Sequence, residues 1–439
     1  MRRAMIKNND KQERNYRQLK IPAALAALVV TAILTFQQAG AQVYPEAYLE
    51  EALRNNPGLQ AEQKAWEASL QQADIASALP DPGLTAGFFT PPMERLMGKQ
   101  WFDVRIMQMF PWFGTLEKQK SAAQYMAEES RQQFREKRNR LFMEMTRLWL
   151  EIYKNEQQQD IIRQSVEILR EREDIIYSRY EGGQQRSGLT LDLYRMEIRI
   201  AGLENRIEKL EEEKNSLTMS FNILTGRDDT AVIETPSGLP EASLPDSHIP
   251  AGDDGFEDNP QLNMAQARAE AAEIQKEVSR LMTRPSLGVG LQYSYFAPGR
   301  AAMGQMEGGH MIMPMVSVSL PVFRKKNRAT RQQSLLLAEA DSFRESEQVN
   351  SLRTEWIQLV SASKNLRRDS EFYRQQLEIT LKAWELVLTG YASGEEGFDE
   401  LLQLQDQLVD LEWRLLEASI SQHIKYAEMD MLRGRNIFK

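Results

Sequence analysis

The sequence contains no cysteine and only three histidines in 439 residues. Without cysteine the chain can form no disulfide, offers no thiolate to a metal ion and has no attachment point for the lipid of a lipoprotein. The histidines, His248, His310 and His423, are far apart, and no glycine-rich phosphate loop stands between a predicted strand and a predicted helix. We therefore find no catalytic constellation. We predict that the protein is not an enzyme and needs no cofactor, and we expect each histidine to be exposed.

Long hydrophobic runs are absent after the N-terminus, so no membrane-spanning helix is predicted in the body of the chain. At the N-terminus, residues 1–20 carry seven Lys or Arg against two Asp or Glu, residues 21–36 are apolar, and Ala39-Gly40-Ala41 supplies small residues. This layout predicts a secretory signal peptide over residues 1–41 that is cleaved; an uncleaved anchor is the alternative. Cleavage would change the net charge from −9 to about −14, which argues against nucleic acid as a partner.

What the sequence has in abundance is a heptad pattern between residues 116 and 226. Apolar residues, among them Ile162, Val166 and Leu169 and then Leu203 and Leu210, alternate at four- and three-residue spacing along an outgoing stretch of about 65 residues and a returning stretch of about 38. At about 1.5 Å per residue the outgoing helix would be about 96 Å long. The pattern predicts helices wound around one another, with a break at Glu181-Gly182-Gly183.

The chain also repeats its own motifs at an offset of 203 to 211 residues. Such order indicates an internal duplication, in which each half contains a helix, a β-hairpin, a long helix and a returning helix. The matching motifs are Asn56-Pro57 with Asn259-Pro260, Pro111-x-Phe113 with Pro321-x-Phe323, Tyr180-x-x-Gly183 with Tyr391-x-x-Gly394, and Leu224-Thr225-Gly226 with Leu432-Arg433-Gly434.

These matches predict a first repeat over residues 42–229 and a second over residues 259–439. A connector at residues 230–258, rich in Pro, Gly, Ser and Asp, joins them as a disordered linker or as a packed belt. The predicted β-hairpins span about 83–111 and 286–321, and the coiled-coil hairpins span 116–226 and 326–434.

Three predicted strands, Phe102–Ile106, Leu287–Tyr295 and Val316–Leu320, alternate apolar with small or polar residues. Alternation is typical of lipid-facing barrel strands and also of half-buried strands in a soluble sheet. The helix lengths favour the barrel. The short helix and the returning helix of each half together span about 90 Å, close to the length of the long helix, as expected of a tube wall of uniform height. Four strands cannot close a barrel, so other copies of the chain must pair the open edges.

With these motifs, and with Asp192-Leu193 and Glu400-Leu401 just past the helix breaks, the chain resembles the TolC-like outer-membrane efflux proteins over residues 46–434. The resemblance implies a mainly α fold with a small β part: a homotrimer whose α-helical tunnel is topped by a shared twelve-stranded transmembrane β-barrel. It places the chain in the outer membrane of a Gram-negative-type cell, with a long periplasmic portion.

The resemblance also implies a function and partners. The chain would be the passive conduit of a tripartite efflux or secretion system. Its partners would be outer-membrane lipid, a periplasmic adaptor and an inner-membrane pump, of RND type rather than ABC type. The main alternative is a soluble periplasmic coiled-coil adaptor (a membrane fusion protein), which predicts one helical hairpin in a β-rich domain instead of a duplicated plan. A purely structural coiled coil leaves the strands unexplained.

Acidic residues gather near the two predicted helix breaks, among them Asp192, Asp399 and Glu400. Threefold symmetry would arrange these carboxylates as a negative ring that holds or passes cations, and we predict a periplasmic gate there. The alternative is that acidic residues favour the first turn of a helix. The predicted tips onto which an adaptor docks are formed by Tyr180, Gly183, Tyr391 and Gly394.

Methionine is concentrated in the loop between the second pair of predicted strands. Its thioether sulfur suits Cu(I) or Ag(I), so one hypothesis is that the channel exports such heavy metals and binds them in this loop. The alternative is that methionine fills an apolar surface or a strand. The predicted ligands are Met303, Met306, His310 and Met311, and the matching region of the first half holds Met93, Met97, Met107 and Met109.

Overall fold

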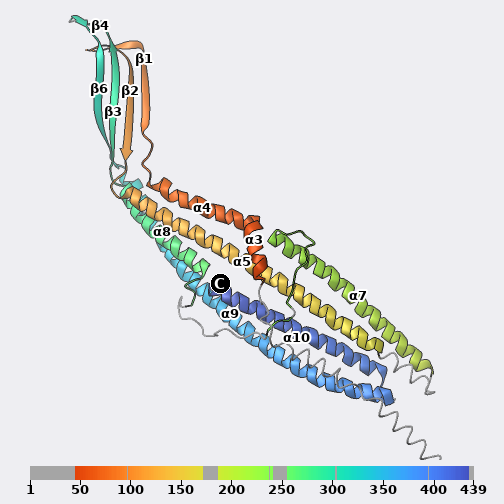
Figure 1. Ribbon diagram of the computed structural model, residues 1–439. Coiled ribbons are helices and arrows are strands. Elements are labelled where there is room, and N and C mark those ends of the chain that lie inside the picture. Colours follow the sequence, from red (N-terminus) through yellow and green to blue (C-terminus); the bar gives the residue numbers. More distant parts are fainter. Residues whose placement is uncertain are drawn as a thin grey trace, which may run out of the picture. The chain divides into compact units, whose positions relative to one another are not determined.

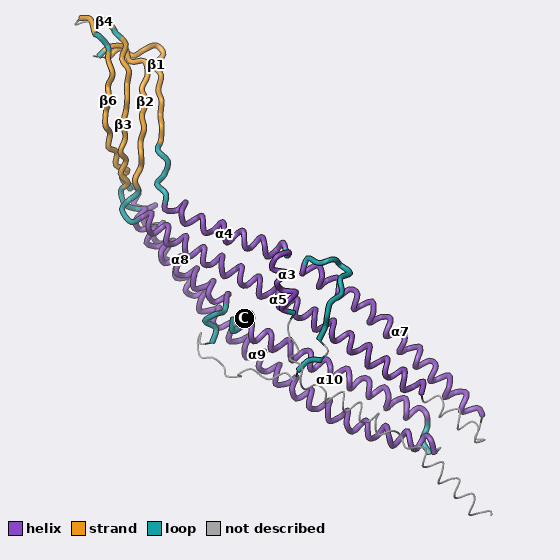
Figure 2. Tube along the Cα trace, in the orientation of Figure 1, coloured by secondary structure: helices purple, strands orange, loops and turns teal. Residues whose placement is uncertain are grey.

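The structure is a computed structural model of the chain. It describes residues 45–95, 97–171, 186–236, 238–240, 255–301, 304–393 and 395–434. The predicted signal peptide and the predicted break at residues 181–183 lie outside these ranges. Long helices make up most of the described chain, and the longer strands form one small sheet (Figure 1, Figure 2). The mainly α fold with a small β part is confirmed.

Apart from two short strands in the second half, the two halves contain the same elements in the same order, as the duplication predicted. One helix, α3 (Glu46–Asn55), precedes them and was not predicted. The first half contains α4 (Pro57–Ser77), β1 (Gly83–Arg95), β2 (Gly98–Phe110), α5 (Thr115–Glu171) and α7 (Arg186–Thr225). The second contains α8 (Pro260–Met282), β3 (Ser286–Ala297), the short β4 (Gly299–Ala301) and β5 (Gly304–Met306), then β6 (Gly309–Ser319), α9 (Arg324–Ser393) and α10 (Phe398–Leu432).

The chain divides into two compact units, and neither coincides with one repeat. Of the described residues, the first unit contains those within 45–49, 145–240 and 363–426, and the second contains those within 50–144, 255–362 and 427–434. Each unit therefore takes segments from both halves of the sequence. Because α5 and α9 are 57 and 70 residues long, each contributes to both units.

The second unit contains the sheet, whose strand order is β1-β2-β3-β6 with every pair antiparallel. The two predicted hairpins are thus neighbours, joined by the pairing of β2 with β3. In an antiparallel pair, residues directly opposite one another lie on the same face, and successive residues alternate between faces. The register therefore assigns every strand residue to one of two faces. β1 and β6 form the two edges of this sheet.

The short helices of the second unit begin at the two repeated asparagines. The side-chain oxygen of Asn56 accepts a hydrogen bond from the backbone N–H of Leu59 at 3.0 Å, and that of Asn259 accepts one from Leu262 at 3.1 Å. The proline that follows each asparagine has no N–H to satisfy, so it suits the first turn. Asn259 is also buried and donates from its amide nitrogen to the Leu432 carbonyl at 2.8 Å. This contact joins the start of α8 to the end of α10.

The first unit is helical, and its core uses the predicted heptad positions. Burial of each large aliphatic side chain stabilises the bundle by about 1.5–3 kcal/mol. Residues from four helices meet in one cluster: Ile162, Val166 and Leu169 of α5, Met196, Leu203 and Leu210 of α7, Leu388 and Tyr391 of α9, and Phe398 and Leu401 of α10.

Residues 230–236 and 238–240 of the connector are packed in the first unit, and residues 255–258 are packed in the second, where the ring of the buried Phe256 lies 6.3 Å from that of Trp356. The indole nitrogen of Trp149 donates to the Glu234 carbonyl at 3.0 Å, and Ile233 is buried. His423, expected to be exposed, is buried, and its ring nitrogen lies 3.1 Å from the Pro240 carbonyl. That expectation was wrong because the heptad phase of α10 turns this position towards the connector. Over the described residues the connector matches the belt alternative.

Candidate functional site

The predicted gate residues of the first unit lie where α7 and α10 run side by side near their first turns. Asp192 and Asp399, on different helices, both pair with Arg195: its Nη1 atom is 2.9 Å from the Asp399 carboxylate and 3.8 Å from that of Asp192. Tyr391 of α9 donates from its hydroxyl to Asp192 at 3.4 Å. We call Asp192, Arg195, Tyr391 and Asp399 the tip cluster. It links three helices through one guanidinium and one phenol.

The tip cluster combines exposed charge with a buried anchor. Tyr391 is almost fully buried, and its ring lies 5.6 Å from that of Phe398. The Asp399 side chain, by contrast, is 66% exposed. Tyr391 therefore fixes the position of Asp192 from inside the core, while Asp399 faces solvent. Glu400 is also exposed and lies outside the cluster.

A second ion pair between α7 and α10 lies farther along these two helices. Arg199, one turn after Arg195, pairs with Asp406, one heptad after Asp399. Burial raises the pKa of the Asp406 carboxyl, and the Arg199 guanidinium acts in the opposite direction. Sequence reasoning selected Asp192 and Asp399 and missed Asp406 and both arginines. The i, i+4 spacing of Arg195 and Arg199 beside an acidic partner helix was the available signal.

The other predicted tip residues cannot be placed, because Tyr180, Gly183 and Gly394 lie outside the described residues. Tyr391 is placed, and its burial prevents direct contact with a docking protein. Docking at the tips remains a prediction. Tyr391 would support the docking surface from within the core, through its hydrogen bond to Asp192.

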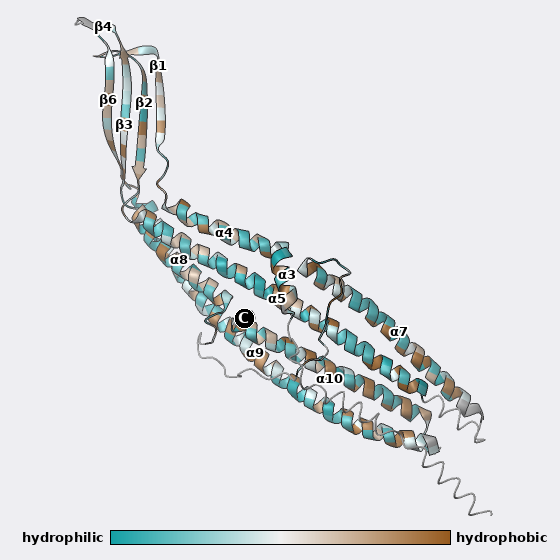
Figure 3. Cartoon of the chain, viewed as in Figure 1, coloured by the Kyte–Doolittle hydropathy of each residue, from teal (hydrophilic) through white to brown (hydrophobic). Residues whose placement is uncertain are grey.

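The sheet of the second unit has one apolar and one polar face. On the apolar face, Phe88 and Val316 are 79% and 76% exposed. On the polar face, Arg105 donates to Gln292 at 3.1 Å and Gln292 donates to Asp103 at 3.3 Å. The alternation can be followed along the strands in Figure 3. The register assigns Leu84, Phe88, Phe102, Val104, Ile106, Leu287, Val289, Leu291, Tyr293, Tyr295, His310, Ile312, Val316 and Val318 to the apolar face.

Aromatic rings gather at one end of the apolar face. The ring of Phe102 lies 6.3 Å from that of Phe88 and 5.9 Å from that of Tyr295. His310, a predicted metal ligand, belongs to this group, because its ring lies 5.4 Å from that of Tyr295 and its Nδ1 atom lies 2.6 Å from the Tyr293 hydroxyl. The group resembles the aromatic girdle of a membrane barrel.

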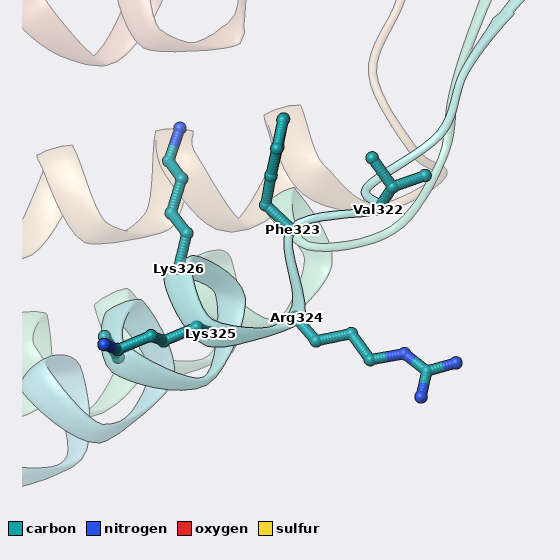
Figure 4. Close-up of a pocket in the computed structure, with 6 residues that line it drawn as sticks. Val322, Phe323, Arg324, Lys325 and Lys326 are labelled. Atoms are coloured by element: carbon teal, nitrogen blue, oxygen red, sulfur yellow. The ribbon is translucent and has the colours of Figure 1, made fainter.

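At the opposite end of the sheet, the turn from β6 into α9 carries a different composition. Phe323 is 74% exposed and is followed directly by Arg324, Lys325 and Lys326. Figure 4 shows that Phe323 and Lys326 point to the same side of this turn. Phe113, at the matching turn after β2, is 80% exposed. We call Phe113, Phe323 and the three cations the collar. Sequence reasoning noted the phenylalanines but not the basic run.

The predicted metal ligands are not brought together. Met303 lies outside the described residues, and Met306 is in β5. His310 and Met311 are successive residues of β6, so they lie on opposite faces of the sheet. Among the described residues, no group of three or more His, Asp or Glu side chains could hold a metal ion. Metal binding in this loop remains a prediction.

Comparison with known proteins supports the resemblance seen in the sequence. Residues 254–435 match the family model described as outer membrane efflux protein. The comparison with curated proteins gives no match. No described helix is both long and apolar enough to cross a membrane.

Solved structures share the fold. The outer-membrane channel OprN is 16% identical with a TM-score of 0.71, covering 89% of each chain. CusC, described as forming a transmembrane channel, is 15% identical with a TM-score of 0.73, covering 90% of this chain and 92% of that one. The outer membrane protein VceC from Vibrio cholerae is 15% identical with a TM-score of 0.72, covering 89% and 95%. The resemblance to the TolC-like outer-membrane efflux proteins is confirmed.

Proposed function

We propose that this TolC-like efflux protein is the outer-membrane channel of a tripartite exporter. Residues 1–41 direct export and are removed, and three mature chains assemble into one conduit. The conduit carries out no chemistry; it receives substrate from a periplasmic adaptor and an inner-membrane pump of RND type, and it opens to the outside. A soft metal ion, Cu(I) or Ag(I), is the substrate class that we propose.

The observation that carries this proposal is a four-stranded sheet with one exposed apolar face and two open edges. Unpaired backbone groups cannot remain in a lipid bilayer, because each costs several kcal/mol without a partner. β1 and β6 must therefore pair with other copies of the chain. With the apolar face outward and the Asp103–Gln292–Arg105 hydrogen bonds inward, the pattern matches a membrane barrel with a polar lumen.

The collar supports a membrane position for the sheet. An exposed phenylalanine followed by three cations suits the boundary where acyl chains meet lipid phosphates. The aromatic group around Phe102 would mark the other boundary. The four long strands contain 11 to 13 residues each, which is enough to cross a bilayer when tilted.

The helices support self-association. Within each unit, exposed apolar residues of α9 recur at seven-residue spacing: Leu336 and Phe343 in the second unit, and Phe372, Ile379 and Leu386 in the first. The two sets are out of phase by one residue. A seven-residue repeat is the spacing by which one helix packs along another. We assign both sets to contact between copies of the chain.

The tip cluster supports a gate. Three copies of Asp192 and Asp399 around one axis would repel one another, and Arg195 offsets that repulsion by pairing with both. In this arrangement α7 and α10 are held together, which corresponds to a closed tip. Opening requires these pairs to break, and a docked adaptor would stabilise the separated helices.

The adaptor alternative is not favoured, because the matching family model and the solved structures of the same fold are outer-membrane proteins or channels. The four-stranded sheet with one apolar face also has no role in a soluble adaptor. A soluble protein would bury that face, whereas here Leu84, Phe88 and Val316 are exposed.

A matched pair of substitutions in β1 tests the proposal. Leu84 lies on the apolar face and Thr85 on the polar face of the same strand. Lysine on a lipid-facing position costs about 2–4 kcal/mol at the bilayer centre, whereas a lumen position tolerates it. We expect the full-length protein and its Thr85→Lys variant to enter the outer-membrane fraction as trimers and conduct ions in planar bilayers. Leu84→Lys should fail to do so. Equal behaviour of the two variants, or a monomeric wild-type protein without conductance, would contradict the proposal.

A further inference from the structure

The polar face of the sheet contains an unexpected set of methionines. Charged and amide side chains of β2 and β3 occupy its middle, and thioethers lie beside them on β6 and closer to the helices on β2. The register assigns five methionines to this face: Met107 and Met109 on β2, and Met311, Met313 and Met315 on β6. A methionine set on the face opposite to the apolar one has no lipid or protein core to fill among the described residues.

Two of these methionines converge on one point. Gly288 and Gly290 of β3 have no side chains, so Met107 and Met109 extend from β2 across the space above them. A Cβ atom placed on Gly288 would lie 2.7 Å from the Met109 sulfur and 3.2 Å from the Met107 sulfur. The two sulfurs are therefore no farther apart than the sum of those distances. Both side chains are only half-buried.

The far side of this space is bounded by β6. The Ser317 hydroxyl lies 3.7 Å from the Met107 sulfur and 3.9 Å from the Met109 sulfur. Met315 stands opposite Gly290 on the same face of the sheet, so its side chain starts beside this space. We call Met107, Met109 and Met315 the methionine cluster. The cluster lies on the polar face of the sheet, over Gly288 and Gly290, with the Met107 and Met109 sulfurs next to the Ser317 hydroxyl.

The chemistry of the cluster is selective. Packing above two glycines needs volume only, which leucine or isoleucine would supply. Thioether sulfur adds a soft, uncharged donor that binds Cu(I) and Ag(I) and has little affinity for hard cations such as Mg²⁺ or Ca²⁺. Because the ligands are neutral, they would hold such an ion without the tight charge pairing that would prevent its release.

We propose that the methionine cluster binds a soft monovalent cation, Cu(I) or Ag(I), with Met107 and Met109 as the principal ligands and Met315 as the third. If the polar face lines the lumen, as in the function proposed above, this site lies on the path of exported substrate. The inference rests on that function only for the role of the ion as cargo. The binding site itself rests on the geometry of β2, β3 and β6.

Silver binding by the purified full-length protein tests the site. Ag(I) in chloride-free buffer is dialysed against the wild-type protein in detergent, and bound silver is measured by elemental analysis. We expect binding that is lost in the Met107→Leu, Met109→Leu double variant, because leucine keeps the volume and removes both sulfurs. The matched control, Met126→Leu with Met219→Leu, changes two exposed methionines on helices and should bind silver as the wild type does.

A second variant disturbs the cluster without removing a ligand. Gly288→Ala adds a Cβ atom inside the van der Waals distance of both sulfurs, so it should weaken silver binding while both methionines remain. Absence of silver binding by the wild type, or equal binding by the Met107→Leu, Met109→Leu variant, overturns the inference.

Conductance separates this inference from the proposed function. The Met107→Leu, Met109→Leu variant should conduct ions in planar bilayers as the wild type does. Conductance without silver binding would refute the cluster as a site and leave the channel intact. Methionine-dependent silver binding by a protein that never conducts would instead refute the role of the ion as cargo.

Discussion

Replacing Arg195 with alanine should open the channel. Arg195 is the single described cation that pairs with both Asp192 and Asp399, at 3.8 and 2.9 Å. Its removal takes the Arg195 charge away from both carboxylates, so the repulsion among like charges around the axis of the proposed trimer grows. The closed tip therefore becomes less stable, because it loses the ion pairs with Arg195 and gains repulsion between carboxylates. The free energy of an open tip, in which these groups are apart, should change little.

The size of the effect follows from exposure. The Arg195 side chain is 37% exposed and Asp399 is 66% exposed, so solvent screens the pair. Exposed pairs contribute about 0.2–1 kcal/mol each. We expect about 1 kcal/mol per chain and about 3 kcal/mol for three tips that open together. Because 1.4 kcal/mol is about a factor of ten, the open probability should rise by up to roughly a hundredfold.

Single-channel recording in planar bilayers measures this change. Arg170→Ala is the matched control, because Arg170 makes a comparably exposed pair with Glu204 between α5 and α7, away from the tip cluster. The charge-reversed variant Arg195→Asp with Asp399→Arg should return towards the wild type. At 1 M salt the difference should shrink, since the screening length falls to about 3 Å. Equal open probabilities for Arg195→Ala and Arg170→Ala would refute the gate.

Three further predictions concern stability. Burial raises the pKa of Glu412 from 4.5 to about 7. The contribution of Glu412 to the free energy of unfolding is therefore complete below pH 4.5 and is lost as the pH rises through about 7. Glu412→Gln should stabilise the protein at pH 8, by up to about 3 kcal/mol, and change little at pH 4.5, as thermal unfolding will show. Burial lowers the pKa of His423 below 6.5. The contribution of His423 to the free energy of unfolding is therefore present above pH 6.5 and is lost as the pH falls through the pKa of the folded protein. His423→Gln should therefore reduce the difference in unfolding temperature between pH 7.5 and 5.5; an unchanged difference would contradict its burial against Pro240. Asn259→Ala should cost about 2 kcal/mol in urea unfolding, more than Asn56→Ala at about 1 kcal/mol, because Asn259 is buried and its loss also leaves the Leu432 carbonyl without that donor.

The sequence predicted those features that depend on local chemistry. The two Asn-Pro pairs predicted the starts of α4 and α8, because the asparagine oxygen and the missing proline N–H act within one turn. The heptads of α5 and α7 likewise predicted which residues are buried, including Ile162 and Leu203. Gly226 and Gly434 end their helices with φ of 70° and 64°, values that favour glycine.

Features that depend on register between distant elements could not be predicted. Asp192 and Asp399 were recognised as acidic, but their shared partner Arg195 emerges only when α7 is aligned with α10. The separation of His310 from Met311 likewise needs the strand assignment of β6, because a loop would leave the two side chains free to converge.

The methionine cluster also depends on strand register, so the sequence alone could not identify it. Met107 and Met109 were noted in the sequence together with Met93 and Met97, without a way to distinguish them. Only the pairing of β2 with β3 shows that Met107 and Met109 extend over glycines. The i, i+2 spacing of the two methionines, opposite a Gly-x-Gly of equal spacing, was the signal available in the sequence.

The two unpaired edges of the sheet have a genetic consequence. In the proposed trimer, every copy must supply an intact β1 to one neighbour and an intact β6 to the other, so one defective copy interrupts the whole ring. In a cell that makes equal amounts of normal and edge-defective chains, only about one trimer in eight would contain three normal copies. A defective allele, such as one with proline substituted in the middle of β6, should therefore be dominant over the normal gene.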